Sequence, residues 1–430
     1  MMAYMKTEPV RMAAARSSVW NRVRLQLSAG LLISVFFPYL VRLWLEGPAA
    51  DGISLQNSLV GTGVALVAGY YGFRRSSHYP GVMKSASILP FFGIAYATVL
   101  IVFLFARLDY SRIHFGASFL LCVVWYYLVF FKMQRQKSLQ IGIIPFGDVD
   151  SLRAISGISW ITISDSRSDA TALDAVVADL RADIPDEWER YLTDCALEGV
   201  LVLHVKQVTE SLTGCVRIDH LSENNFGSLI PEIVYGKLKR IGDLAVAALA
   251  LPLLAPVLLA AGLIVRLTSP GPALFRQPRM GYRGKPFTVY KLRTMHASAE
   301  AEDERQAAVT VTNDERITPF GAFLRRYRID ELPQIINIFR GEMSWIGPRP
   351  EAVPLSLWYE AELPFYRYRH IVRPGITGWA QVNQGHVAGV DDVLWKLQYD
   401  FYYVKNFSFW LDLLIVARTI KTVFSGFGAR

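Results

Sequence analysis

An adjacent pair of carboxylates, Asp330 and Glu331, is the part of the sequence best suited to chemistry. The pair follows Arg328 and precedes Pro333. Neighbouring arginines and a helix N-terminus would lower the pKa of Asp330 and attract phosphate, so Asp330 would stay ionised and attack a phosphorus atom. Glu331 would then be free to hold a divalent cation that neutralises a diphosphate. The alternative is that Asp330 caps a helix beginning near Pro333 and that the arginines form a solvated face.

Further motifs surround this pair in a fixed order and spacing. They are Lys239-Arg240-x-x-Asp243, Tyr290-Lys-Leu-Arg-Thr-Met295, Asp314-x-Arg-Ile-Thr318, Asp330-Glu-Leu-Pro-Gln334, Gly347-Pro-Arg-Pro350 and Arg373-Pro-Gly-Ile-Thr-Gly-Trp379. Together they resemble the bacterial sugar transferases, which are monotopic polyprenyl-phosphate phosphoglycosyl transferases. The resemblance is closest to the large members, in which four membrane helices and a soluble domain precede the catalytic unit. It covers residues 239 to about 424, and over 1–236 it is architectural only.

The resemblance implies a reaction and a set of site residues. Asp330 would displace UMP from a UDP-sugar and become a phosphosugar ester, while Glu331 would bind Mg²⁺. A polyprenyl (undecaprenyl) phosphate at the membrane surface would then take the phosphosugar from Asp330. Positive groups are needed along that path because charge spreads over the phosphate oxygens. The substrate-binding candidates are Lys291, Arg293, Arg316, Arg328 and Arg349, and for each of them the alternative is a surface ion pair.

The resemblance also indicates a biological setting. It implies an enzyme on the cytoplasmic face of the bacterial inner membrane that initiates the synthesis of an exopolysaccharide, capsule or O-antigen. UDP-glucose or UDP-galactose is the favoured donor, because large members of the family usually transfer these sugars. Two alternatives are left open: an N-acetylhexosamine donor, and a non-catalytic membrane scaffold of a polysaccharide-export complex. Intact Asp330, Glu331 and Arg349 argue against the scaffold.

The composition requires that the chain lie partly in lipid and partly in water. Of its 430 residues, 52% are hydrophobic and only 19% are charged, whereas soluble domains have about 25% charged residues. Four apolar runs, at 25–45, 55–73, 87–106 and 113–131, are each long enough to cross a bilayer as a helix. Basic residues lie in the loop between the second and third runs and after the fourth run. This arrangement predicts four crossings with both ends cytoplasmic.

A fifth apolar run, 241–265, differs from the first four. Pro252 and Pro256 lie in its middle, and basic residues flank both of its ends. Proline kinks a helix, and positive charge on both sides disfavours moving either flank across the membrane. We therefore expect a re-entrant helix that enters the bilayer and returns to the cytoplasmic side. An ordinary kinked span is the alternative. Ala255 stands where family members often have serine, which leaves the break dependent on the prolines.

Residues 138–236 have the composition and the sequence pattern of a water-soluble domain. They carry 6 Lys and Arg against 16 Asp and Glu. Strand-like runs at 139–145, 158–163 and 200–205 alternate with helical patterns at 173–180 and 188–197, which predicts a small Rossmann-like α/β domain with a parallel sheet. Asp148-Val149-Asp150 could in principle hold a metal, although a turn or helix cap is the more common role of such a pair.

The sequence thus predicts a membrane protein of mixed α and α/β class with three domains. These are the four transmembrane helices (1–137), the cytoplasmic acidic α/β domain (138–236) and the catalytic domain (237–430). Its last helix, near 407–424, suits an amphipathic interfacial helix, with ordinary packing as the alternative. No nucleic-acid-binding pattern is present, and the three scattered cysteines predict neither a disulfide framework nor a zinc site. A homodimer is left open.

Overall fold

The computed structural model describes residues 22–47, 52–76, 84–134, 140–155, 158–218, 231–296, 316–384 and 390–425. The chain forms two compact units, residues 1–214 and 215–430. All three cysteines, Cys122, Cys195 and Cys215, are free and buried. They therefore serve as small core residues, consistent with the sequence.

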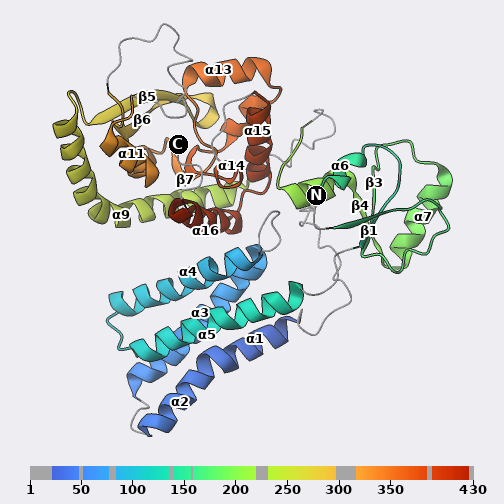
Figure 1. The fold of residues 1–430 in the computed structure, drawn as a ribbon, viewed down its shortest axis with the longest axis horizontal. Coiled ribbons are helices and arrows are strands. Elements are labelled where there is room, and N and C mark those ends of the chain that lie inside the picture. The colour runs from blue at the N-terminus through green and yellow to red at the C-terminus, as the bar shows by residue number, and fades with distance from the viewer. Residues whose placement is uncertain are drawn as a thin grey trace. The chain divides into compact units, whose positions relative to one another are not determined.

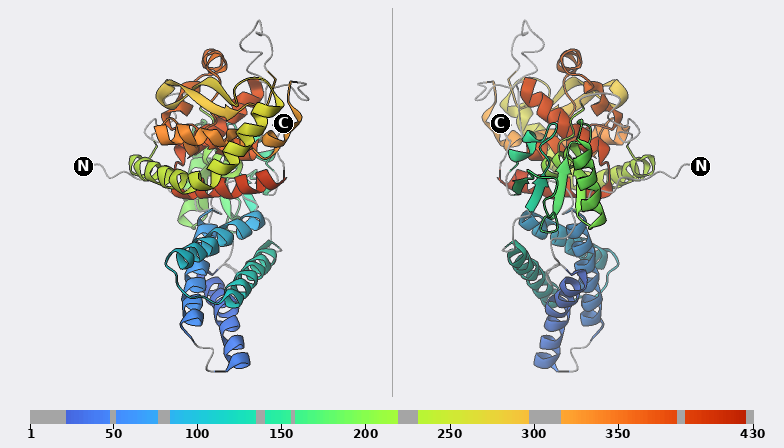
Figure 2. Two further views of the ribbon diagram at one scale, coloured as in Figure 1. Left: turned by 90° about the vertical axis from the view of Figure 1, so that its left-hand side faces the viewer. Right: turned by 90° about the vertical axis from the view of Figure 1, so that its right-hand side faces the viewer.

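The first unit begins with long helices that pack on one another through aromatic and aliphatic side chains (Figures 1 and 2). A continuous helical stretch, Val23–Glu46, comprises α1 (Val23–Leu31), a π-helical turn (Leu32–Phe36) and α2 (Phe37–Glu46). It is followed by α3 (Ile53–Ser76), α4 (Lys84–Phe105) and α5 (Arg112–Gln134). The rings of Phe92 and Tyr126 stack at 4.5 Å in the core of this bundle.

Four helices among the described residues are long and apolar enough to cross a membrane. They are Val23–Leu45, Ser87–Phe105, Arg112–Lys132 and Ile233–Thr268. The predicted run at 55–73 forms a helix, α3, but does not belong to this set. Its polar side chains explain why: Ser58 and Thr62 are fully buried, and the Thr62 hydroxyl donates to the Ser58 carbonyl at 2.8 Å.

The α/β part of the first unit contains a four-stranded, fully parallel sheet in the order β2-β1-β3-β4. Its strands are β1 (Gln140–Ile143), β2 (Ser159–Thr162), β3 (Ala175–Ala178) and β4 (Leu201–His204), and its helices are α6 (Asp150–Arg153), α7 (Asp186–Leu197) and α8 (Val205–Thr213). The parallel sheet and the helix at 188–197 are as predicted. The helix predicted at 173–180 is wrong: this segment supplies β3, whose four residues are all buried between two neighbouring strands.

The second unit begins with α9 (Ile233–Thr268), which contains both prolines of the predicted break. The backbone stays helical through Pro252 and Pro256, and Figure 1 shows the helix turning sharply in its middle. Leu253 and Leu259, near the turn, are 76% and 75% exposed. If straight, a helix of this length would extend for about 54 Å, nearly twice the hydrocarbon thickness of a bilayer.

Both ends of α9 are attached to the same globular unit. Near its start, the Lys239 ammonium lies 2.6 Å from the Asp412 carboxylate, and the Trp345 indole donates to the Asp243 carbonyl at 3.2 Å. Beyond its end, Arg293 donates to the Ser269 carbonyl at 2.7 Å. The two halves of the helix also contribute to two hydrophobic clusters of this unit. Residues at both ends of α9 are therefore bound within the unit to which the helix belongs.

The rest of the second unit is built around an antiparallel hairpin, β5 (Leu274–Met280) and β6 (Pro286–Leu292), and a short parallel pair, β7 (Ser344–Ile346) and β8 (Gly375–Thr377). The helices around them are α11 (Pro319–Arg326), α12 (Ile335–Arg340), α13 (Val353–Glu362), α14 (Trp379–Asn383), α15 (Val390–Lys405) and α16 (Phe409–Ser425). Short 3₁₀ helices lie at η5 (Tyr282–Gly284), η6 (Ile329–Gln334) and η7 (Tyr366–Ile371).

The C-terminal helix α16 packs more deeply than an interfacial helix would. Leu411, Leu414 and Ile415 are fully buried, and Asp412 accepts hydrogen bonds from the hydroxyls of Tyr403 and Tyr235. Only part of its apolar surface is left for lipid, including Phe409 at 57% exposed. Packing against its neighbours is therefore the main role of its apolar stripe.

Candidate functional site

Asp330 and Glu331 lie in the 3₁₀ helix η6, between α11 and α12. Asp330 is inside this helix, so the alternative role as a helix cap is wrong. The residue in the cap position is Arg328, which has a positive φ of 56° and makes no side-chain cap. A non-glycine residue in this region is strained, and such strain often marks a functional site. The tight turn leaves both carboxylates buried, at 8% and 5% exposed.

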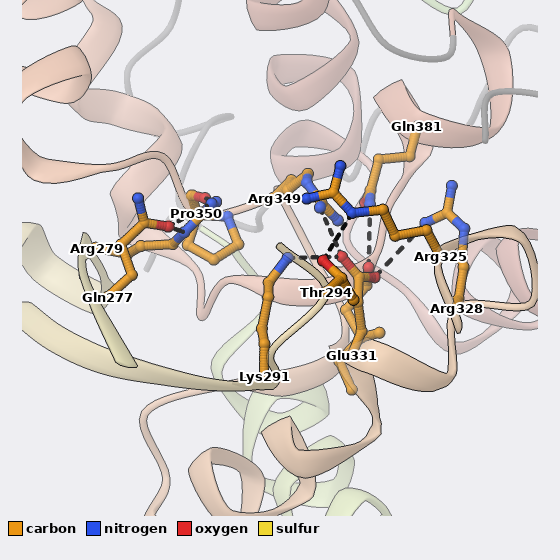
Figure 3. A network of polar contacts seen from close by, with 11 residues as sticks. Gln277, Arg279, Lys291, Thr294, Arg325, Arg328, Glu331, Arg349, Pro350 and Gln381 are labelled. Atoms are coloured by element: carbon orange, nitrogen blue, oxygen red, sulfur yellow. Dashed lines mark hydrogen bonds and ion pairs between the residues drawn. The ribbon is translucent and has the colours of Figure 1, made fainter. Parts of the chain in front are cut away.

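Glu331 is the centre of a cluster of basic groups (Figure 3). Its Oε1 accepts from the Arg349 guanidinium at 2.6 Å and from the Lys291 ammonium at 3.0 Å. Its Oε2 lies 3.8 Å from Arg328 and has no hydrogen-bond partner among the described residues. Burial by itself would raise the pKa of Glu331, but Arg349 and Lys291 hold that pKa well below its usual value. Glu331 is therefore ionised.

Asp330 differs from its neighbour because its carboxylate makes no hydrogen bond within the described part of the chain. Burial and then the negative charge of Glu331 raise the pKa of Asp330 to about 6, against the opposing charges of Lys291 and Arg349. The depressed pKa expected for Asp330 is thus wrong and belongs to Glu331. Asp330 is nevertheless largely ionised near neutral pH, and its oxygens are free to attack an electrophile.

The structure brings three of the five predicted basic residues to Glu331, namely Lys291, Arg328 and Arg349. Arg293 points elsewhere, since its guanidinium binds the carbonyl and the hydroxyl of Ser269 at the end of α9. For Arg316 the structure shows a backbone contact, in which its carbonyl accepts from the amide of His296 at 2.9 Å. Asp314, in the same motif, lies outside the described residues.

The motifs around Arg349 and Trp379 form a close backbone contact. The Gly347 amide donates to the Thr377 carbonyl at 2.8 Å. A Cβ atom on Gly378 would lie 2.2 Å from the Gly347 carbonyl oxygen, so no larger residue fits at this position. The glycines in these motifs therefore let β7 and β8 approach closely, and this contact places the loop that carries Arg349 next to η6.

Sequence reasoning missed several residues that surround the site. The Arg325 guanidinium donates to the Thr294 hydroxyl at 2.9 Å, and its charge acts on Asp330. Arg279 donates to the Pro350 carbonyl (Figure 3), and the buried Arg369 donates to the Arg349 carbonyl at 2.9 Å. Arg325 belongs to the basic run before the carboxylates and was a detectable candidate. Arg279 and Arg369 are distant in sequence, so no local pattern revealed them.

The residues of this cluster are suited to a Mg²⁺ ion whose coordination shell is completed by substrate oxygens. No group of three or more His, Cys, Asp or Glu residues within the described ranges could enclose a metal. Mg²⁺ usually binds one or two carboxylates and completes its shell with water and substrate phosphates. The buried, unpartnered Oε2 of Glu331 is a suitable ligand atom. Asp148 and Asp150 have structural positions, since the Asp148 amide donates to Asp179 and Asp150 begins α6, and they belong to no group of three potential metal ligands among the described residues.

Comparisons with known proteins identify the family of the chain. The bacterial sugar transferase family matches residues 234–426. The UDP-N-acetylgalactosamine-undecaprenyl-phosphate N-acetylgalactosaminephosphotransferase of Aeromonas hydrophila is 41% identical over 403 residues, which are 93% of this chain and 94% of that protein. The UDP-glucose:undecaprenyl-phosphate glucose-1-phosphate transferase of Caulobacter vibrioides is 43% identical over 46% of this chain and 73% of its own.

The enzyme of the same name from Escherichia coli is 43% identical over 44% of this chain and 40% of its own length. These glucose-named relatives match less than half of this chain, whereas the Aeromonas hydrophila protein matches nearly all of it. The basic cluster around two buried carboxylates, the apolar helices and the full-length match together identify this chain as a membrane phosphoglycosyl transferase of the bacterial sugar transferase family.

Proposed function

We propose that this enzyme transfers a sugar 1-phosphate from a UDP-sugar to undecaprenyl phosphate through a phosphosugar ester of Asp330. The observation that carries the proposal is the contrast within the carboxylate pair. Asp330 is buried and has no hydrogen bond to a described residue, whereas Glu331 is held by Lys291 and Arg349. A nucleophile needs free oxygens, and a developing phosphate charge needs fixed cations.

In the first half-reaction, an Asp330 oxygen attacks the β-phosphorus of the UDP-sugar. The bond from that phosphorus to the bridging oxygen breaks, and UMP leaves with the electron pair. In the second half-reaction, a phosphate oxygen of undecaprenyl phosphate attacks the same phosphorus and releases the Asp330 carboxylate. Lys291 and Arg349, already fixed beside the pair, would stabilise the charge on the phosphoryl oxygens in both steps.

Glu331 is the proposed ligand of Mg²⁺ through Oε2, its unpartnered oxygen. A bound Mg²⁺ would neutralise part of the diphosphate charge and so make UMP a better leaving group. Glu331 is suited to this role because its low pKa keeps it ionised. Its Oε1 is already engaged by Arg349 and Lys291, so the cation would approach from the other oxygen.

The proposed donor is UDP-N-acetylgalactosamine, with UDP-glucose as the second candidate. The family resemblance favours glucose or galactose, with an N-acetylhexosamine as the alternative. The relative named for N-acetylgalactosamine supports the change of order, because it matches 93% of this chain, whereas the glucose-named relatives match 46% and 44%. An enzyme that initiates an exported polysaccharide would fit either sugar.

The catalytic unit is proposed to lie on the cytoplasmic face of the inner membrane, with α9 dipping into the bilayer without crossing it. Contacts at both ends support this arrangement. Lys239 near the start and Ser269 beyond the end are both bound to residues of the same unit. A straight spanning helix would separate these contacts by the thickness of the membrane. Exposed leucines near the turn are suited to lipid.

The function is tested with the detergent-purified full chain, a panel of UDP-sugars and Mg²⁺, in the absence of lipid acceptor. We expect stoichiometric UMP release and a mass increase equal to one sugar phosphate, located on Asp330 by peptide mapping. UDP-N-acetylgalactosamine should react fastest. Adding undecaprenyl phosphate should remove the adduct and allow turnover. If no UDP-sugar releases UMP, the scaffold hypothesis is favoured and the enzyme mechanism is rejected.

Topology is tested by cysteine labelling in intact cells with a membrane-impermeant thiol reagent. The native cysteines are all buried, so they give a low background. Arg283→Cys, at the exposed tip of the β5–β6 hairpin, should resist labelling until the cells are opened. Leu108→Cys, in the loop between α4 and α5, is the matched control and should label at once. Labelling of both positions in intact cells would reject the re-entrant arrangement.

A further inference from the structure

A buried ion pair lies behind the loop that carries Arg349. Arg369 in η7 and Asp400 in α15 are 3% and 1% exposed. The Arg369 Nη2 and Nε atoms lie 2.8 Å and 3.1 Å from the same Asp400 oxygen, Oδ2. Burying such a pair costs more desolvation free energy than a hydrophobic pair of the same size, so stability alone is a weak reason to keep it. Its remaining contacts suggest another reason.

Arg369 has donors left over after binding Asp400, and they reach the Arg349 loop. Its Nη2 also donates to the Arg349 carbonyl at 2.9 Å, and its Nη1 donates to the Tyr366 hydroxyl at 2.7 Å. The next carbonyl, that of Pro350, accepts from Arg279 (Figure 3). The carbonyls of two consecutive residues, Arg349 and Pro350, are therefore held by two different guanidinium groups.

The following residue is held by the same helix that carries Asp400. The Glu351 carboxylate pairs with Lys396, one turn before Asp400 in α15, and the Glu351 carbonyl accepts from the Met280 amide at 2.9 Å. Prolines at 348 and 350 restrict φ on either side of Arg349. The loop backbone thus has few degrees of freedom left, and the Arg349 guanidinium is directed at Glu331.

We propose that Arg369 and Asp400 are positioning residues, which set the Arg349 backbone so that its guanidinium meets Glu331 and the transferring phosphoryl group. The inference rests on the proposed function, because it assigns a task to Arg349 in that reaction. Neither residue touches the substrate in this proposal. Arg369 acts through the Arg349 carbonyl, and Asp400 acts by fixing the plane of the Arg369 guanidinium. Lysine cannot bridge both acceptors in this way, since it lacks the planar fork of donors.

The test is a double-mutant cycle measured on steady-state UMP release by the full chain, with undecaprenyl phosphate present as the acceptor. Arg369→Lys should lower kcat by about tenfold and change KM for the UDP-sugar by less than about twofold. In an Arg349→Ala background the same substitution should change kcat by less than about twofold, because the group that it positions is gone. Equal losses in both backgrounds would show a general structural role and overturn the proposal, as would unchanged kcat in the single variant.

Two further variants keep the test decisive. Tyr366→Phe removes only the hydroxyl that binds Arg369 and preserves the side-chain volume, so it replaces Arg369→Lys in the cycle if that variant does not fold. Its loss of kcat should be smaller, and it should disappear in the Arg349→Ala background. Arg367→Lys is the matched control, because Arg367 is exposed and its side chain lies 3.7 Å from Glu360. It should leave kcat unchanged, and a loss equal to that of Arg369→Lys would count against the proposal.

Hydrogen exchange can be measured whether or not the protein is active, so it tests this inference separately from the proposed function. Amide hydrogen exchange at Gly347, Arg349 and Glu351, the residues of this loop that have an N–H, should accelerate in Arg369→Lys, while the β5–β6 hairpin keeps its wild-type protection. If the wild-type protein releases no UMP but the exchange result holds, the proposed function fails and the positioning contact stands. If UMP is released normally and the loop exchanges at its wild-type rate in Arg369→Lys, the positioning inference fails and the proposed function stands.

Discussion

Asp179 in the first unit and Asp330 in the second are both buried aspartates near arginine, with exposures of 5% and 8%. Both oxygens of Asp179 are occupied. One accepts from the Asp148 amide at 3.2 Å, and the other accepts from the amide and the Nε of Arg181, each at 3.2 Å. Asp330 has several cations nearby, yet none of the described residues donates a hydrogen bond to it.

The two environments shift the pKa in opposite directions. Burial opposes ionisation of Asp179, but the donated hydrogen bonds lower its pKa below 3.8. Burial and the charge of Glu331 raise the pKa of Asp330 to about 6. A carboxylate such as Asp179, whose two oxygens both accept hydrogen bonds, stabilises the fold. A carboxylate such as Asp330, which has cations nearby but no donor bound to it, keeps oxygens that can react. The contrast separates a structural carboxylate from a proposed nucleophile without any reference to sequence motifs.

The largest difference is expected from replacing each aspartate by asparagine. Asp330→Asn should lower the rate of UMP release by at least about a thousandfold, because the amide is not a nucleophile at this position. Asp179→Asn should keep UMP release within about twofold and lower the stability of the α/β domain by about 1–3 kcal/mol. Stopped assays of UMP release and thermal unfolding measure the two effects. Unchanged turnover in Asp330→Asn would reject the covalent mechanism.

Glu331→Gln should lower kcat by on the order of a hundredfold, which is less than the loss in Asp330→Asn. The amide keeps the shape of the side chain but lacks the charge that holds Arg349, Lys291 and the cation. The Mg²⁺ concentration for half-maximal rate should rise in this variant. A Mg²⁺ titration of UMP release in both proteins measures it. An unchanged Mg²⁺ requirement would remove Glu331 from the proposed metal site.

The titration of the two aspartates should differ in the absence of divalent cations. Asp330 should lose its proton near pH 6, so its ionised fraction falls as the pH is lowered through that value, by about tenfold for each pH unit well below it. Asp179 should stay ionised until the pH is below 3.8. Carboxyl ¹³C NMR, with the matching asparagine variants for assignment, measures both. Equal titration midpoints for Asp330 and Asp179 would contradict the proposed difference between their environments.

The smallest effect on activity is expected at the turn that positions Asp179. Gly147 has a positive φ of 77°, and a Cβ atom there would lie 2.6 Å from the Asp179 carboxylate. Gly147→Ala should destabilise the α/β domain by about 1–3 kcal/mol because the backbone is strained and the contact is too short. UMP release should change by less than about twofold. A loss of activity larger than the loss of folded protein would indicate that this domain takes part in catalysis.

Much of the fold could be predicted from periodicity, and the errors have physical causes. The helix at 188–197 has a regular amphipathic pattern and was found. The short run at 173–180 was assigned to the wrong class, because four apolar residues in the centre of a parallel sheet have the same pattern as a turn of buried helix. The run at 55–73 forms α3, whose buried Ser58 and Thr62 make it more polar than α4 and α5, so composition alone does not select it as a span and the four-crossing topology stays a prediction.

The candidate site was predicted only where its residues are close together along the chain or belong to a recognisable motif. Lys291, Arg328 and Arg349 were named from motifs, and the structure brings all three to Glu331. Arg293 was named on the same grounds but binds the end of α9. A motif identifies a residue type at a position, and the direction of the side chain depends on packing that the motif does not describe.

The sequence by itself determined the family, the apolar runs, the two prolines within α9 and the carboxylate pair, because each of these depends on residue types over a short distance. Only the tertiary structure decided which carboxylate has the low pKa. Glu331 and Asp330 are neighbours in the same basic stretch, but Arg349 and Lys291 come from other elements and bind Glu331. Electrostatic energy depends on distance in space, so the low pKa expected for Asp330 belongs instead to Glu331, whose carboxylate Arg349 and Lys291 contact directly.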